Sequence, residues 1–384
     1  VWASGGLDSS AILHYARKGA AGRLKTFSVS FRGETFDESR YFREVAARFG
    51  TDHHEFDLNP GPELADTIES LVEYGDEPSA DAGALPVWYL SRMCREHVTV
   101  ALSGEGADEL FGGYYTYLAD RYARALRLVP ALARRAALKL LGNWPVSDDK
   151  IGLEYKLKRF LAGSLLDPFE AHLFWNGTFS RQEKARLLAL PCATDVTSLK
   201  ALLPPEAGRL DSLNRLLWLD QVCYLPDDIL YKCDRMSMAH SLEVRPPFLD
   251  HRIVEFAASL PAGLKVRGSK LKFLLRELMR GKLPPAVLTR KKEGFDIPAH
   301  RWLRGVLRPL LLETLSPAAV ERTGLFRKGA VEAAIGAHLG RRANLGYHLW
   351  GLLILFLWMR KWGIRTPGRG AEMACSRAGA AATN

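Results

Sequence analysis

The chain has 384 residues, of which 47% are hydrophobic and 25% are charged. This is the composition of a globular protein with room for roughly two or three domains, or for one large α/β unit. The net charge of +10 is unevenly spread: residues 33–109 contain 18 Asp or Glu and 5 Arg, whereas residues 265–308 contain 13 Lys or Arg and 3 Asp or Glu. Such a division suits a metal–triphosphate site as well as it suits RNA, so charge alone does not indicate a nucleic-acid partner.

The sequence indicates neither a membrane-spanning helix nor a structural metal site. The most apolar run, residues 349–359, has 11 residues, whereas a helix that crosses a bilayer needs roughly 20. It therefore predicts a buried helix and no membrane span. The five cysteines form no CxxC pair and no Cys/His zinc pattern, which favours a reducing cytoplasm and no structural metal; they are Cys94, Cys192, Cys223, Cys233 and Cys375.

A glycine- and serine-rich loop, SGGLDSS, occupies residues 4–10. Glycines allow the backbone to approach phosphate oxygens, and the N–H groups at the start of a following helix, expected over residues 11–18, bind the anion. The carboxylate of Asp8 would repel a phosphate unless a cation lies between them, and Mg²⁺ is the simplest candidate. The loop lacks the Gly-Lys-Ser/Thr ending of the common P-loop, so it indicates a different class of nucleotide site.

The next 100 residues alternate between strand and helix patterns. Short β-prone runs predict strands at 24–31, 53–58 and 98–102, and apolar spacing predicts helices at 37–49 and 85–95. This alternation predicts a parallel sheet with helices on both faces, in which ligands bind beyond the carboxyl ends of the strands. The adjacent His53 and His54 would point to opposite faces of a strand, so we expect structural roles for them. From about residue 120 the pattern is helical.

The predicted strand at 98–102 runs into a second motif, SGEGADELFGGY, at residues 103–114. It packs Glu105, Asp108 and Glu109 into five residues, and clustered carboxylates repel each other unless a cation or hydrogen-bond donors compensate. Asp108 can share Mg²⁺ with Asp8, and Glu105 is placed to act as a base. The alternative is an acidic helix N-terminus that complements the helix dipole.

Two further blocks combine charge with apolar residues. The first, residues 234–250, contains Asp234, Arg235, Glu243 and Arg245, which suit either structural ion pairs or contacts to a substrate. The second, residues 270–277 with 290–295, is basic, and Lys272 could clamp a leaving pyrophosphate. A solvent-exposed basic helix face is the alternative.

The first loop resembles the PP-loop of the ATP pyrophosphatases, and the four blocks in this order resemble the synthetase domain of asparagine synthetase of the glutamine-hydrolysing type. The resemblance covers roughly residues 1–362. It implies an α/β fold, with a parallel-sheet PP-loop core and a mostly helical C-terminal part. It also implies that ATP activates the side-chain carboxylate of aspartate as an acyl-adenylate, pyrophosphate leaves, and ammonia attacks to give asparagine and AMP.

The resemblance assigns roles to matching positions. Glu105 would be the general base of the ammonia step and Lys272 the pyrophosphate and transition-state lysine. Asp8 and Asp108 would hold Mg²⁺. ATP and its pyrophosphate would be held by Ser4, Gly5, Gly6, Asp8, Ser9, Ser10, Val29, Ser103 and Gly104.

We expect residues 1–365 to form the ATP-binding, amide-forming domain with a truncated first strand, and residues 366–384 to be a disordered tail. The family carries an N-terminal glutaminase domain whose first residue is a cysteine. Because no cysteine precedes Cys94, we expect that domain to be absent from this chain and ammonia from glutamine to be supplied by the parent protein. The expected partners are small molecules, with no nucleic acid and no membrane, and a homodimer is compatible with the resemblance.

Three alternatives remain. A relative within the family could amidate a peptide, a sugar or a secondary metabolite; ring-closing relatives tend to lose the glutamate that is kept here as Glu105, which favours an external nitrogen nucleophile. A PP-loop enzyme acting on tRNA would share only the first motif, and its thiolating members add paired cysteines that are missing here. A non-enzymatic protein derived from a synthetase is the third, and the complete set of Asp8, Glu105, Asp108 and Lys272 argues against it.

Overall fold

The computed structural model describes residues 1–364 except 35, 60, 143, 146, 148–151, 191–198, 200–201, 291–293 and 295–296. The predicted disordered tail, residues 366–384, therefore lies outside the described residues. The same holds for four residues of the second basic stretch, Lys291, Lys292, Glu293 and Phe295.

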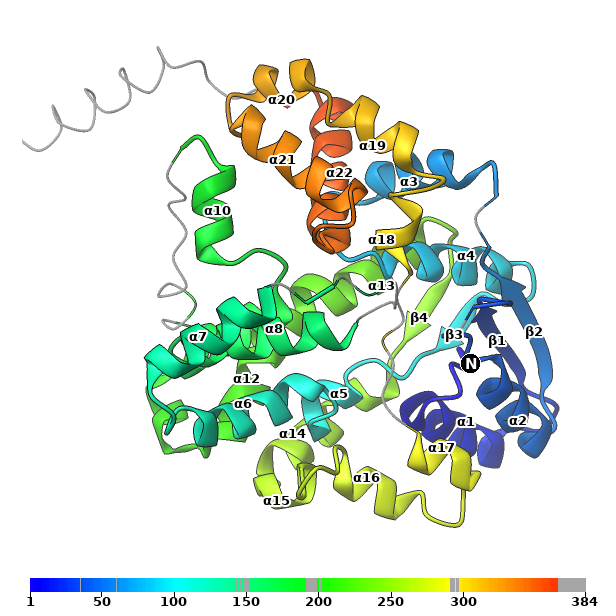
Figure 1. The fold of residues 1–384 in the computed structure, drawn as a ribbon. Helices are drawn as coiled ribbons and strands as arrows, with labels where there is room; N and C mark the ends of the chain where they lie inside the picture. The colour runs from blue at the N-terminus through cyan, green and yellow to red at the C-terminus, as the bar shows by residue number, and fades with distance from the viewer. Residues whose placement is uncertain are drawn as a thin grey trace, which may run out of the picture.

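The strands form a small parallel sheet at one end of the molecule (Figure 1). Strand β1 (Lys25–Ser30) pairs with β2 (Asp52–Asp57), and β3 (Val100–Leu102) pairs with β4 (Glu243–Arg245), each pair in parallel. Residues 1–3 join the two pairs, because Ala3 N donates to Phe27 O at 2.8 Å and Trp2 N donates to Leu102 O at 2.9 Å. The hydrogen-bonded order is thus β2, β1, residues 1–3, β3, β4.

Helices cover both faces of this sheet. On one face, α1 (Leu7–Gly19), α2 (Ser39–Phe49), α5 (Ala107–Phe111), α16 (Phe273–Leu278) and α17 (Pro285–Thr289) share an apolar cluster. The other face belongs to a larger cluster that contains residues of α3 (Leu64–Tyr74), α4 (Ala84–Arg95), α13 (Tyr231–Met238), α18 (Ala299–Trp302), α19 (Arg308–Thr314), α20 (Pro317–Thr323), α21 (Lys328–Leu339) and α22 (Gly346–Lys361). The predicted layering of helices about a parallel sheet is confirmed in a fold that is largely helical.

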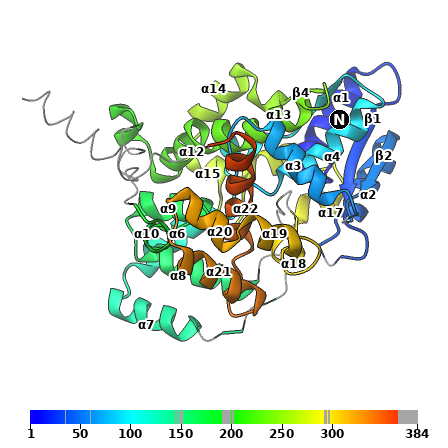
Figure 2. The same cartoon turned by 90° about the horizontal axis from the view of Figure 1, so that it is seen from above.

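A separate group of helices lies beside the sheet, on the left in Figure 1 and again on the left in Figure 2. It contains α6 (Tyr115–Leu126), α7 (Ala131–Gly142), α8 (Leu153–Ser164), α9 (Pro168–Asn176), α10 (Arg181–Leu187) and α12 (Ser212–Val222). A 3₁₀ turn (Pro205–Arg209) precedes α12, and a π-helical turn, η2 (Leu225–Leu230), links α12 to α13. After β4 come a 3₁₀ turn (Pro247–Leu249), α14 (His251–Ser259) and α15 (Ala262–Lys265).

The sequence-based elements agree closely with the structure. The apolar run at 349–359 lies within α22, where Leu349, Trp350 and Leu353 are almost fully buried. His53 and His54 have the predicted structural roles: His53 Nδ1 lies 2.9 Å from Thr26 Oγ1, and the His54 ring stacks on Phe27 at 5.2 Å. Within the described residues no helix is long and apolar enough to cross a membrane.

Strand β4 is the element that the predicted all-helical pattern after residue 120 missed. It has three residues, too few for an alternating pattern to be visible. Glu243 and Arg245 flank its centre, and Ser103 N donates to Arg245 O at 3.0 Å, so β4 fixes the backbone where β3 enters the second motif.

Candidate active site

The PP-loop connects residues 1–3 to helix α1 and packs tightly on α2. Gly5 has φ 68°, and a Cβ on it would lie 2.5 Å from Phe42 N, so no other residue fits there without moving α2. The Ser4 and Ser9 hydroxyls lie 3.0 Å apart, and Gly6 N donates to Ser4 Oγ at 3.3 Å. The loop is thereby folded into the turn that presents the start of α1 to a phosphate.

The second motif begins at the same edge of the sheet and contacts the first. A Cβ on Gly104 would lie 2.9 Å from Ser9 N and 3.0 Å from Asp8 Cβ, so this glycine permits the close approach of the two motifs. Gly106, at φ 87°, then starts the short helix α5, which buries Asp108. Both Ser-Gly motifs therefore meet at one edge of the sheet, beyond the carboxyl ends of the strands, where ligands of parallel sheets are expected to bind.

Lys272 closes the site from a third direction. Its Nζ lies 2.6 Å from Asp8 Oδ2 and 2.7 Å from Asp108 Oδ1, and the lysine is only 4% exposed. Residue 272 immediately precedes α16 and has φ 50°, which is unusual for a non-glycine residue. The structure thus brings together three residues from distant parts of the sequence, since Asp8 and Lys272 are 264 positions apart.

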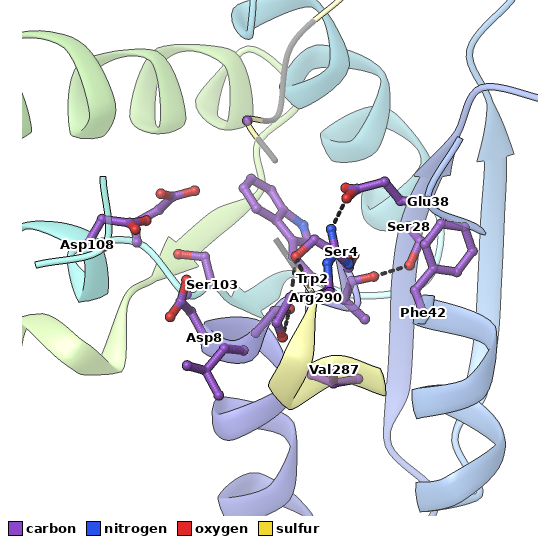
Figure 3. A pocket seen from close by; sticks show the side chains of 18 of the residues that line it. Trp2, Ser4, Asp8, Ser28, Glu38, Phe42, Ser103, Asp108, Val287 and Arg290 are labelled. Carbon is purple, nitrogen blue, oxygen red and sulfur yellow. Dashed lines mark hydrogen bonds and ion pairs between the residues drawn. The ribbon is translucent and has the colours of Figure 1, made fainter. Parts of the chain in front are cut away.

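One pocket contains most of the predicted site residues (Figure 3). In this view Asp8, Ser103 and Asp108 lie on one side, and Ser28 and Phe42 lie on the other. The predicted residues that line the pocket are Ser4, Gly6, Asp8, Ser9, Val29, Ser103, Gly104, Glu105, Asp108 and Lys272. An apolar wall suited to a nucleobase is formed by Trp2, Phe27, Val29, Phe31, Phe36 and Leu90.

Two predicted residues of the loop do not line this pocket. Gly5 shapes the turn, as described above, and Ser10 is 1% exposed within α1. Their contribution to the pocket is therefore indirect, through the conformation of the loop and the packing of the helix.

The four predicted substrate residues are also absent from the pocket lining. Arg235 pairs with Asp76 at 2.7 Å, and not with its neighbour Asp234, because adjacent residues of a helix do not face each other. Glu243 and Arg245 pair with each other at 2.7 Å, and both side chains are more than half exposed. The ion-pair interpretation is therefore the one that the structure favours for Arg235, Glu243 and Arg245.

Glu38 and Arg290 belong to the pocket but were not predicted as site residues. They form an ion pair, and Arg290 Nη1 donates to Ser4 O at 3.4 Å (Figure 3). The Arg290 guanidinium also lies over the Tyr41 ring. Arg290 was visible as part of the second basic stretch, whereas Glu38 follows no motif and only the folded chain places it beside the PP-loop.

Two buried acids have raised pKa values, and one of them, Glu109, belongs to the second motif. Burial and the neighbouring Asp108 carboxylate raise the pKa of Glu109 to about 7, and the Tyr114 hydroxyl donates to its carboxylate. Lys232 pairs with Asp81, and burial together with the Asp81 carboxylate raises the pKa of Asp228 to about 7.

The carboxylates fit a Mg²⁺ ion carried by a nucleotide. Asp8 Oδ1 is buried and has no hydrogen-bond partner among the described residues. In the same part of the chain no group of three or more His, Cys, Asp or Glu side chains could hold a metal. Magnesium sites of nucleotide enzymes commonly use one or two carboxylates, with water and phosphate oxygens completing the octahedron.

Comparison with known proteins gives one consistent result. Residues 2–360 match the Asparagine synthase family. Asparagine synthetase [glutamine-hydrolyzing] 1 of Bacillus subtilis is 30% identical over 92% of this chain and 55% of its own length. Asparagine synthetase [glutamine-hydrolyzing] 3 of the same organism is 29% identical over 85% of this chain and 49% of its own length.

A more distant similarity extends to a protein named as an amidase. Amidase chry2 of Gibberella zeae is 24% identical over 90% of this chain and 56% of its own length. The chain spans about half the length of the curated relatives that it matches. Since the family match runs through the PP-loop, the second motif and the lysine before α16, the resemblance found in the sequence is confirmed, and the chain belongs to the asparagine synthase family.

Proposed function

We propose that this chain is the ATP-dependent amide-forming domain of an asparagine synthetase. It adenylates the side-chain carboxylate of aspartate, releases pyrophosphate, and lets ammonia attack the acyl-adenylate to give asparagine and AMP. The observation that carries the proposal is the convergence of the PP-loop, the second motif and Lys272 on one pocket with an apolar wall.

The adenylation step needs positioning and charge compensation more than covalent help from the protein. The start of α1 and the hydroxyls of Ser4 and Ser9 are placed to hold the phosphate groups, and Val29 belongs to the wall that would cover the adenosine. Lys272 borders the pocket beside Asp8, and we assign its ammonium to the negative charge that develops on the leaving pyrophosphate in the transition state.

Mg²⁺ would be held by Asp8 and Asp108 and would screen the phosphate charges while the carboxylate attacks. For the second step we assign Glu105 as the base. It lines the same pocket as the PP-loop, so it can take a proton from the attacking ammonia when the N–C bond forms and AMP leaves.

The nitrogen source lies beyond these residues. The Bacillus subtilis relatives are named glutamine-hydrolyzing, and the match covers about half of their length. We therefore propose that glutamine hydrolysis belongs to the part of the parent protein that this match does not include. Ammonium salts would replace it in an assay of this chain.

The test separates the two chemical steps. The chain is incubated with aspartate, ATP, Mg²⁺ and ammonium, and AMP, pyrophosphate and asparagine are measured. Glu105→Gln should keep aspartate-dependent exchange of pyrophosphate into ATP but lose about 100-fold in asparagine formation, because general base catalysis contributes roughly 10²–10⁴-fold. ADP as the product, or turnover that does not depend on aspartate, would contradict the proposal.

A second candidate keeps the chemistry and changes the acceptor. The similarity to Amidase chry2, and the absence of the four predicted substrate residues from the pocket, leave a carboxylate of a peptide, sugar or secondary metabolite as the alternative. A screen of carboxylic acids by pyrophosphate release decides between them. A better substrate than aspartate would move this chain to the second candidate.

The remaining alternatives have less support. A tRNA-modifying PP-loop enzyme would share the first motif only, whereas the family match extends over residues 2–360. A scaffold without activity would not need to keep Asp8, Asp108 and Lys272 in contact.

A further inference from the structure

Lys272 stands between the two carboxylates that we assign to Mg²⁺. Its Nζ is 2.6 Å from Asp8 Oδ2 and 2.7 Å from Asp108 Oδ1, and the residue is buried. The proposed function uses the same lysine for the phosphates and the same carboxylates for the metal. Lys272 therefore contacts the same two carboxylates that we assign to the metal.

We propose that Lys272 is a built-in counter-ion that blocks metal binding in the nucleotide-free site and moves to the phosphates when Mg²⁺ and ATP bind together. The proposal rests on the proposed function, because it takes Asp8 and Asp108 as the metal ligands. It adds that metal binding is coupled to nucleotide binding through the side chain of one lysine.

Distance makes the two cations competitors. Mg²⁺ binds oxygen at roughly 2.0–2.1 Å. A magnesium ion on an oxygen that already lies 2.6 Å from Lys272 Nζ would be no more than about 5 Å from the ammonium. Like charges at such a distance in a buried site repel strongly, since the medium screens them less than water does.

Charge balance explains why a bound nucleotide would make the two carboxylates favour Mg²⁺ over Lys272. The ammonium offsets one of the two carboxylate charges, which weakens the attraction of this pair for a free divalent ion. A triphosphate brings further negative charge next to the same residues, so the ammonium gains new partners at the phosphates and the metal gains phosphate oxygens as ligands. Only the position of the Lys272 ammonium changes.

The local structure allows the side chain to move while the backbone stays fixed. Lys272 N donates to Gly112 O at 3.3 Å, and Arg276 N donates to Lys272 O at 2.9 Å, so the residue is anchored on both sides. A Cβ on Gly113 would lie 1.8 Å from Asp108 Oδ1 and 2.1 Å from Lys272 Cε, so this glycine provides the room for the lysine stem. The stem has four rotatable bonds and carries a compact charge, which suits a moving cation.

The experiment measures metal binding directly. Mn²⁺ is titrated into the nucleotide-free chain, and free Mn²⁺ is followed by electron paramagnetic resonance for wild type and Lys272→Met. We expect Lys272→Met to bind one Mn²⁺ at least about tenfold more tightly than wild type, because the substitution removes a positive charge from between the two carboxylates (tenfold corresponds to 1.4 kcal/mol). Mg²⁺ should displace the bound Mn²⁺.

Two further variants locate the effect. Lys265 is a matched control, since it is also a buried lysine, 2% exposed, but its Nζ contacts Asn214 Oδ1 at 2.8 Å and no carboxylate of the pocket; Lys265→Met should leave Mn²⁺ binding at the wild-type level. Asp108→Asn in the Lys272→Met background should remove the gained binding. Circular dichroism verifies that each variant is folded, and Lys272→Gln replaces Lys272→Met if the methionine variant is not.

The outcomes separate the inference from the proposed function. Wild type that binds Mn²⁺ without nucleotide as tightly as Lys272→Met overturns the inference and leaves the metal ligands in place. A third arm uses Mn²⁺ with a non-hydrolysable ATP analogue and wild-type protein. If the protein enhances water-proton relaxation in neither this arm nor the Lys272→Met titration, the metal assignment itself fails, and the inference fails with it.

Discussion

Two of the buried clusters in the described part of this chain each place one cation between two carboxylates, and one of these two borders the pocket described above. In the first, Lys272 joins Asp8 to Asp108. In the second, among the helices beside the sheet, His172 Nδ1 lies 2.6 Å from Asp120 Oδ2 and its Nε2 lies 3.0 Å from Asp220 Oδ1. The formal charge pattern is the same, so the difference between them must come from their surroundings.

The His172 cluster has the properties of a structural centre. The imidazole is fully buried, and although burial opposes its charge, the carboxylates of Asp220 and Asp120 raise the pKa of His172 to about 10. Tyr117 donates to Asp220 Oδ2 at 2.6 Å, and Asn176 Nδ2 lies 3.1 Å from His172 Nε2. Helices α6, α9 and α12 are thereby joined through one charged side chain.

The Lys272 cluster differs in what lies next to it. It borders the pocket, and one carboxylate oxygen, Asp8 Oδ1, has no hydrogen-bond partner among the described residues. A flexible lysine takes the place of a rigid imidazole. The exchange that we propose for Lys272 thus depends on two properties that the His172 cluster lacks, a pocket beside the cluster and a cation on a flexible stem.

The largest expected effect is on the stability of the helical part. His172→Gln leaves two buried carboxylates without their cation, and removal of one partner from a buried pair costs about 3–5 kcal/mol. Urea unfolding measures this loss. His251→Gln is the control, because the His251 side chain is 79% exposed and should change stability by less than about 0.5 kcal/mol. A loss below about 1 kcal/mol for His172→Gln would mean that the cluster is not a structural centre.

The raised pKa of His172 predicts that the free energy of unfolding depends on pH more strongly in wild type than in His172→Gln. A group whose pKa is raised on folding stabilises the protein fully below its unfolded pKa, near 6.5, and this contribution is lost as pH rises through the folded value of about 10. Wild type should therefore lose part of its free energy of unfolding between pH 6.5 and 10, and His172→Gln should lose less. Parallel pH profiles for the two proteins would contradict the charge assigned to His172.

The next effect is on ligand binding at the other cluster. A ligand at 100 times its Kd stabilises the folded state by about 2.7 kcal/mol. Mg²⁺ with an ATP analogue should give wild type this increment in thermal unfolding, and Gly113→Ala should lose it, because its Cβ would lie 1.8 Å from Asp108 Oδ1. Gly142→Ala is the control, since a Cβ there meets nothing within 4 Å. An intact increment in Gly113→Ala would show that the site tolerates displacement of Asp108.

These two clusters were unequally visible in the sequence. Asp8, Asp108 and Lys272 follow motifs whose residue types are dictated by phosphate and metal chemistry, and strand order brings the first two to one edge of the sheet. Asp120, His172 and Asp220 lie in helices with no motif, and only tertiary packing brings them together. A lone histidine in a helical pattern carries no signal that it is charged and buried.

The strands show the same limit of prediction from sequence. Strands of six residues, such as β1 and β2, were predicted with bounds close to those observed, because their apolar residues and flanking turns are readable. Strand β4 has three residues and was missed. Glu38 was missed for a different reason: its partner Arg290 is more than 250 positions away, and no local pattern records that pairing.

The smallest expected effect is on a single hydrogen bond of the structural cluster. Tyr117→Phe removes the hydroxyl that donates to Asp220 Oδ2 at 2.6 Å, and hydrogen bonds to charged groups are worth about 1.5–3 kcal/mol. Because His172 still holds Asp220, we expect the lower end of this range in urea unfolding. Tyr122→Phe, on the same helix and half exposed, is the control.

Aspartate-dependent pyrophosphate release by Tyr117→Phe should stay within about twofold of wild type, because this cluster does not border the pocket. A larger loss of activity with little loss of stability would mean that the helical cluster positions the site. Helix α12 would provide the connection, because the Gln221 side chain donates from Nε2 to Glu109 O at 3.0 Å.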